Sequence, residues 1–130
     1  MSNRVHVRVQ KDIVEIFYSI TQSENKKGCE INIAILISTT LLQEQKEIFK
    51  EILGKVMTTK KRKYDINSSI KHIGVNKELL ERFHEKLPPN LDALKLPNTQ
   101  LVSIALKIAI ELEQENKVLF HRILGRVISG

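Results

Sequence analysis

The chain opens with an alternation of apolar and polar side chains that predicts a β-strand. In residues 3–9, valines occupy every second position from Val5 onward, and Arg4, His6 and Arg8 occupy the positions between them. A period of two is typical of a half-buried strand, whose outward face here has two arginines and one histidine. Residues 11–22 then change to helical spacing and predict a short amphipathic helix.

A polar loop over residues 23–30 leads to a long apolar block, residues 31–57. The isoleucines, leucines and valines of this block fall near helical spacing, but residues 43–47 are polar. The pattern therefore predicts either one bent helix or two helices that meet at a corner. Gly54 lies near the end of the block, where it is a candidate C-cap or a point of close helix packing.

The second half of the chain repeats this order of elements. Residues 70–75 predict a weaker strand, and residues 77–87 predict a helix with Asn76 as its N-cap. Residues 100–128 form the last apolar block and are expected to be helical. Two residues can cap that block: Asn98 and Thr99.

The two halves also match residue by residue. Residues 31–57 align with residues 102–128 without a gap at an offset of 71, and twelve of the 27 positions are identical. Residues 5–17 align with residues 71–83 at an offset of 66. Self-similarity of this kind indicates a repeated structural unit. One unit cannot bury its own apolar faces, but two units can, if their strands pair antiparallel and their helices cross.

We therefore predict a mainly α fold of two tandem strand-helix-helix repeats that form an intramolecular pseudo-dimer with one short antiparallel β-ribbon. Repeat 1 is expected over residues 1–57, a basic linker over 58–69 and repeat 2 over 70–130, with one core shared by both repeats. The length of 130 residues and the apolar fraction of 42% fit one domain, or two small units around a common core.

The charge of the chain favours a polyanionic partner. The formal net charge is +6, which suits nucleic acid or an acidic membrane surface. Four consecutive basic residues occur in the linker and are interpreted either as a solvated segment or as a clamp on DNA phosphates. These residues are Lys60, Lys61, Arg62 and Lys63.

Other functional classes lack support in the sequence. Cys29 is the only cysteine, so an intramolecular disulfide is excluded and a reducing compartment is expected. The longest apolar run, residues 31–42, is too short to span a bilayer, and no signal-peptide core follows Met1. We expect a soluble, cytoplasmic protein without a membrane partner. Because no metal-ligand spacing, phosphate loop or nucleophile-base motif is visible, no metal, cofactor or enzyme activity is expected.

The strand-helix-helix unit resembles the ribbon-helix-helix family of DNA-binding proteins, which normally pair two such units as a homodimer. A tandem copy in one chain is similar to the double ribbon-helix-helix accessory proteins that bind the origin of transfer in F-type conjugation. The resemblance implies double-stranded DNA as the partner and a role as a transcriptional repressor or a DNA-processing accessory factor. Family members insert the ribbon into the major groove and contact base edges with its outward side chains.

The resemblance implies a set of DNA-binding residues. Those expected at the bases are Arg4, His6, Arg8 and His72. Ile70 and Gly74 occupy the positions equivalent to Arg4 and Arg8, so base recognition by the second strand is expected to be weaker or absent. In the family, the N-terminus of the second helix also binds a phosphate through backbone N–H groups. That role maps onto Asn32, beside the unfavourable carboxylate of Glu30, and onto Asn98 and Thr99.

Two alternative functions remain. Asn3-Arg4-Val5 and Asn32-Ile33-Ala34 are similar to segments of the nicked-DNA-binding subunit of the DNA phosphorothioation system. The repeat also fits a wholly helical module that binds another protein, and the two repeats could also exchange between two copies of the chain. The DNA-binding ribbon requires residues 5–9 to pair with residues 71–75, and a wholly helical module lacks that pairing.

Overall fold

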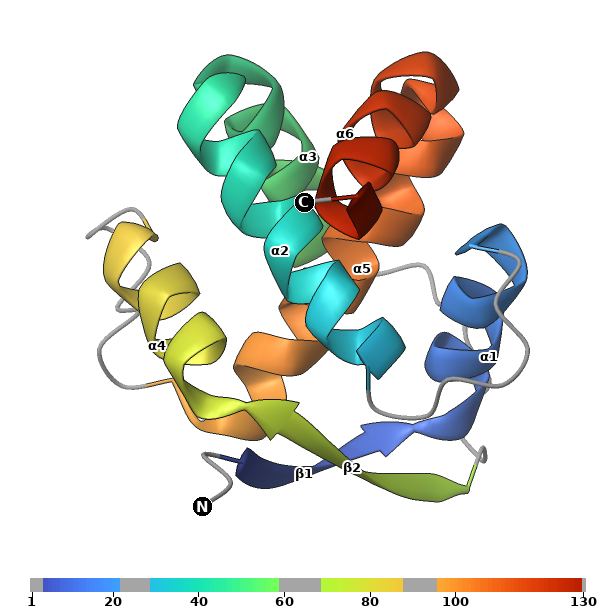
Figure 1. The fold of residues 1–130 in the computed structure, drawn as a ribbon, viewed down its shortest axis with the longest axis vertical. Helices are drawn as coiled ribbons and strands as arrows, with labels where there is room; N and C mark the ends of the chain where they lie inside the picture. The colour runs from blue at the N-terminus through green and yellow to red at the C-terminus, as the bar shows by residue number, and fades with distance from the viewer. Residues whose placement is uncertain (1–3, 22–28, 59–68, 88–95, 130) are drawn as a thin grey trace.

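Two strands and six helices make up the part of the chain that the computed structural model describes, residues 4–21, 29–58, 69–87 and 96–129. The order strand, helix, helix, helix occurs twice (Figure 1). In chain order the elements are β1 (Arg4–Gln10), α1 (Lys11–Thr21), α2 (Cys29–Glu44), α3 (Lys46–Thr58), β2 (Ile70–Asn76), α4 (Lys77–Lys86), α5 (Asn98–Glu115) and α6 (Lys117–Ser129). None of these described helices is long and apolar enough to cross a membrane.

β1 and β2 pair antiparallel, as the alternating pattern predicts, and form a two-stranded ribbon along one end of the molecule (Figure 1). The register places Val7 directly opposite Ile73 at the middle of the ribbon. Val7, Val9, Ile73 and Val75 are buried, so the inward face of the ribbon belongs to the core. A wholly helical fold is therefore excluded.

The helices of the two halves pack across one another. α1 packs against α5, α4 packs against α2, and α2 crosses α5 at the centre of the molecule (Figure 1). At this crossing the buried hydroxyl of Ser38 donates a hydrogen bond of 3.1 Å to the carbonyl oxygen of Ala105. Two phenylalanines from each half are fully buried in one core: Phe17, Phe49, Phe83 and Phe120. The apolar side chains of each half are therefore covered in large part by the other half.

The short elements end within one or two residues of the predicted positions. Asn76 caps α4 as predicted, because its side-chain oxygen accepts a hydrogen bond of 3.1 Å from the backbone N–H of Leu79. Each long apolar block is two helices with a corner between them, at Gln45 in the first block and at Asn116 in the second. The Asn116 side-chain oxygen accepts a hydrogen bond of 3.2 Å from the N–H of Leu119 and so caps α6.

Three local expectations need correction. Gly54 is neither a C-cap nor a point of close packing inside the molecule. α3 continues past Gly54, and a Cβ added there would meet no atom within 4 Å outside its own helix. α2 begins at Cys29, inside the expected polar loop. α5 begins at Asn98 after Pro97, whose side chain makes no capping hydrogen bond, so neither Asn98 nor Thr99 is the N-cap.

Two ion pairs join the two halves of the chain at the end of the molecule opposite the ribbon. Lys55 Nζ lies 2.8 Å from Glu115 Oε1, and Arg126 Nη2 lies 2.6 Å from Glu44 Oε2. The offset of the repeat relates the two pairs, since 115 − 44 and 126 − 55 both equal 71. The hydrogen bonds from Arg126 are the main cause that lowers the pKa of the Glu44 carboxyl. The hydrogen bond to Glu115 likewise raises the pKa of the Lys55 ammonium group.

The lowered pKa of Glu44 predicts a contribution to acid sensitivity. A carboxyl whose pKa is depressed by folding stabilises the fold above its unfolded-state pKa, and that contribution disappears as the pH falls through the folded-state pKa. Between about pH 5 and pH 3, we therefore expect Glu44→Gln to lose less stability than the parent chain in urea unfolding. Glu81→Gln is the matched control, because it removes a carboxyl at an exposed position of α4. Identical pH dependence of Glu44→Gln and the parent chain would contradict the prediction.

Because each half is covered by the other, we expect neither fragment 1–58 nor fragment 69–130 to fold as a monomer. Circular dichroism of each dilute fragment should show an unfolded chain, and mixing equal amounts should restore the helical spectrum. Any folding of one fragment alone should depend on its concentration, because it requires pairing of two copies. A fragment that folds cooperatively at every concentration would show that the two halves are independent domains.

Candidate nucleic-acid interface

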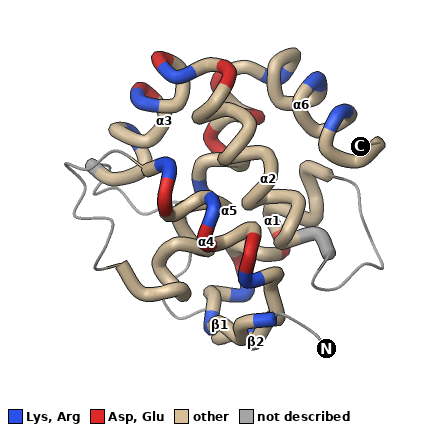
Figure 2. The backbone as a smooth tube through the Cα atoms, turned by 60° about the vertical axis from the view of Figure 1, so that its left-hand side comes forward, with Lys and Arg blue, Asp and Glu red and all other residues tan. Residues whose placement is uncertain are grey.

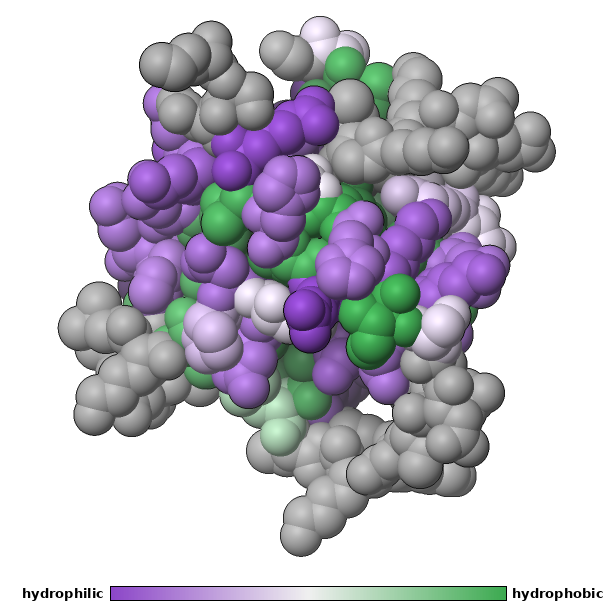
Figure 3. Space-filling view, turned by 90° about the horizontal axis from the view of Figure 1, so that it is seen from below, coloured by the Kyte–Doolittle hydropathy of each residue, from purple (hydrophilic) through white to green (hydrophobic). Residues whose placement is uncertain are grey.

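The outward side chains of the two strands form one surface at the end of the molecule, the ribbon face (Figure 3). It comprises Arg4, His6, Arg8 and Gln10 of β1 and Ile70, His72, Gly74 and Asn76 of β2. The four residues that the family resemblance assigns to base contacts are all exposed there: Arg4, His6, Arg8 and His72. No residue of the ribbon face is acidic, and its two arginines make the face positively charged.

The strand register determines which side chains are neighbours on the ribbon face. His6 lies opposite Gly74, and Arg8 lies opposite His72. A Cβ added at Gly74 would lie 3.5 Å from Arg4 Cδ and 3.5 Å from His6 Cε1, which is ordinary van der Waals contact. The side chains of Arg4 and His6 therefore lean over the glycine, and an alanine at position 74 is sterically acceptable.

Hydrogen bonds hold the N-termini of the two long helices beside the ribbon. The side-chain oxygen of Asn32 on α2 accepts a hydrogen bond of 2.8 Å from the backbone N–H of Asn76, where β2 ends. The hydroxyl of Thr99 on α5 accepts a longer hydrogen bond of 3.4 Å from the backbone N–H of Arg8. Asn98 is exposed at the first position of α5. Asn32 and Thr99 thus connect helix to strand, and phosphate binding by the three residues stays a prediction.

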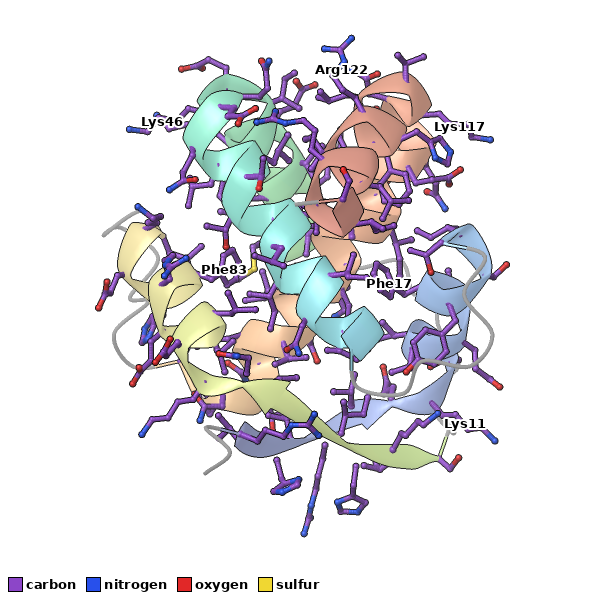
Figure 4. The ribbon with its side chains drawn as sticks, in the orientation of Figure 1. Lys11, Phe17, Lys46, Phe83, Lys117 and Arg122 are labelled. Carbon is purple, nitrogen blue, oxygen red and sulfur yellow. The ribbon has the colours of Figure 1, made fainter. Side chains whose placement is uncertain are left out.

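Two lysines that the sequence analysis did not single out flank the ribbon face. Lys11 and Lys77 are the first residues of α1 and α4, each directly follows a strand, and both are exposed. Figure 4 shows Lys11 beside one end of the ribbon. The repeat alignment contains the signal that identifies them, since the two lysines are identical at the offset of 66. Lys71 faces inward instead, and its Nζ lies 5.4 Å from the centre of the Tyr18 ring.

Other basic residues lie away from the ribbon face. Lys60, Lys61, Arg62 and Lys63 lie outside the described residues, so their predicted phosphate contacts have no structural description. A second basic group lies on α3 and α6 at the opposite end of the molecule (Figures 2 and 4). It includes Lys46, Lys117 and Arg122. Figure 2 shows acidic residues interspersed with the basic ones on α3, whereas the two strands have basic residues only.

The described part of the chain contains no group of three or more His, Cys, Asp or Glu residues placed to hold a metal ion. Comparison of the chain with protein-family models, with curated proteins and with solved structures gave no match.

We expect Asn32→Ala to destabilise the fold, because it removes the side-chain acceptor for the part-buried N–H of Asn76. The expected loss is about 1 kcal/mol in the free energy of unfolding, measured by urea titration. Asn98→Ala makes the same change at an exposed position near the equivalent helix end, and it should alter stability by less than about 0.5 kcal/mol. Equal stability of the two variants would show that the Asn32 hydrogen bond does not contribute to folding.

Proposed function

We propose that this chain is a DNA-binding protein that inserts its ribbon face into the major groove. The observation that supports this function best is the register of β1 and β2. That register gathers Arg4, His6, Arg8 and His72 on one exposed face that contains no carboxylate.

The dimensions and chemistry of the ribbon face suit the major groove. The groove is about 12 Å wide and admits a two-stranded ribbon, whose strands lie about 4.8 Å apart. An arginine guanidinium can donate two hydrogen bonds to the O6 and N7 acceptors of guanine. Lys11 and Lys77 are suited to contact backbone phosphates at the groove edges, which fixes the position of the protein without reading sequence.

We further propose that the two halves are a ribbon-helix-helix pair joined in one chain. Val7 and Ile73 are equivalent at the offset of 66 and are also direct partners in the ribbon, as expected if a two-fold relation between the repeats passes through this pair. The two ion pairs at the opposite end support the same relation, because exchanging the repeats converts one pair into the other.

The proposed role is that of a transcriptional repressor or a DNA-processing accessory factor, as in conjugation. The basic run from Lys60 to Lys63 would add phosphate contacts to those of the ribbon face. Binding of nicked DNA in a phosphorothioation system is the alternative role. A preference for a nicked over an intact duplex of the same sequence distinguishes that role from the first two.

A second candidate function is binding of a protein partner, and the surface of α3 and α6 favours it. Met57 is 47% exposed, Val118 is 71% exposed and Ile128 is 62% exposed, and all three lie on these two helices. Exposed apolar side chains of this kind are available for contact with a protein partner. This end of the molecule lies opposite the ribbon face, so the two functions are compatible.

The proposed function predicts binding to duplex DNA that weakens steeply with salt, because bound lysines and arginines release counterions from the phosphates. The double variant Arg4→Ala, Arg8→Ala should bind a generic duplex at least about tenfold more weakly in fluorescence-anisotropy titrations. The double variant Lys46→Ala, Lys117→Ala removes the same charge at the opposite end and should bind nearly as well as the parent chain. If the arginine variant and the parent chain bind with equal affinity, the ribbon face is not the DNA-binding surface.

A further inference from the structure

We infer that the DNA site recognised by the ribbon face is not a palindrome. Each half of the ribbon face presents one arginine, but the two arginines lie at unequal distances from the centre of the ribbon. This inference rests on the proposed function and adds the class of DNA sequence to it. It follows from the register of the ribbon, the exposure of its outward residues and the contacts around Gly74.

Antiparallel pairing mixes the two strands within each half of the ribbon face. On one side of the central pair Val7–Ile73 lie four outward residues: His6, Gly74, Arg4 and Asn76. On the other side lie Arg8, His72, Gln10 and Ile70. Each half therefore has one arginine, one histidine and one amide side chain. The second strand is expected to recognise bases more weakly. Because each half of the face combines residues of both strands, however, both halves have an arginine.

The two arginines lie at different distances from the central pair. Arg8 is one residue from Val7 and Arg4 is three residues from it, which corresponds to about 3 Å and about 10 Å along a strand. Base pairs in DNA rise by about 3.4 Å per step. A ribbon that follows the groove thus presents one arginine about one base pair from the centre and the other about three base pairs away, on opposite sides.

The remaining outward positions increase the difference between the halves. Arg4 and His6 lean over Gly74, which has no side chain that could contact a base. This half therefore presents Arg4 and His6 to the DNA and nothing from position 74. The Asn76 oxygen is occupied in capping α4. In the other half, Ile70 is 53% exposed and apolar, which suits contact with the methyl group of a thymine.

The expected site therefore has a guanine about three base pairs from the centre in half A, the half facing Arg4. In half B, the half facing Arg8, the guanine is about one base pair from the centre, with a thymine farther out. A duplex that joins half A to half B should bind more tightly than a palindrome of either half. The expected difference is about tenfold or more, because each palindrome mismatches one arginine.

Selection from a library of random duplexes tests the inference directly. The parent chain should enrich a non-palindromic sequence. Arg4→Ala should lose the preference at the outer guanine of half A, and Arg8→Ala should lose it at the inner guanine of half B. If the parent chain binds DNA but selects a palindrome or no consensus, the inference is overturned. The inference is also overturned if both variants lose their preference at the same base pairs. A parent chain that binds no duplex even at low salt would refute the proposed function, and the inference with it.

An exchange variant gives a second test without changing net charge. Arg8→Gly combined with Ile70→Arg gives both halves an arginine at the outer position and a glycine at the inner position. Circular dichroism first establishes that the variant is folded. The variant should then prefer the palindrome of half A over the parent's selected site in anisotropy titrations. Retention of the parent's preference would overturn the inference.

Discussion

Val7 and Ile73 meet at the middle of the ribbon, and the antiparallel pairing around them fixes both faces of the sheet. Because successive side chains point to opposite faces, a slip of one residue would turn the valines of β1 to solvent and Arg8 toward the core. Asn32 and Thr99 oppose such a slip, since each binds a backbone N–H at one strand. The register that buries the valines is thus the register that assembles the ribbon face.

The ribbon also determines how the helices are arranged. Each strand leads directly into a short helix, and that helix packs against the long helix of the other half. The crossing of α2 and α5 then encloses phenylalanines from both halves in one core. The ion pairs of Glu44 and Glu115 join the two halves at the end of the molecule opposite the ribbon. These pairs are exposed, so they add little to the stability that the buried apolar side chains provide.

The elements with a strong local signal could be predicted from sequence. The alternation around Val7 and the capping side chain of Asn76 depend on neighbouring residues alone, and the structure confirms both. The sequence did not distinguish a corner at Gln45 or Asn116 from one bent helix, because a polar interval is compatible with either geometry. The hydrogen bonds of Asn32 and Thr99 join residues that are distant in sequence, so no local pattern contains them. For the candidate site, the sequence identified the outward side chains, but it did not show how the strands divide them between the two halves.

The buried hydroxyl at the crossing of α2 and α5 illustrates what a single chain with two similar halves can do that a homodimer cannot. Ser38 donates to the carbonyl oxygen of Ala105, and the position equivalent to Ser38 in the second half is Ala109. In a homodimer, a gene that encoded this serine would place two hydroxyls in the core, and each would need its own acceptor. When one gene encodes both halves in one chain, a hydroxyl can occur at Ser38 without a second hydroxyl at Ala109. A substitution can therefore alter one half of the molecule and leave the equivalent position of the other half unchanged.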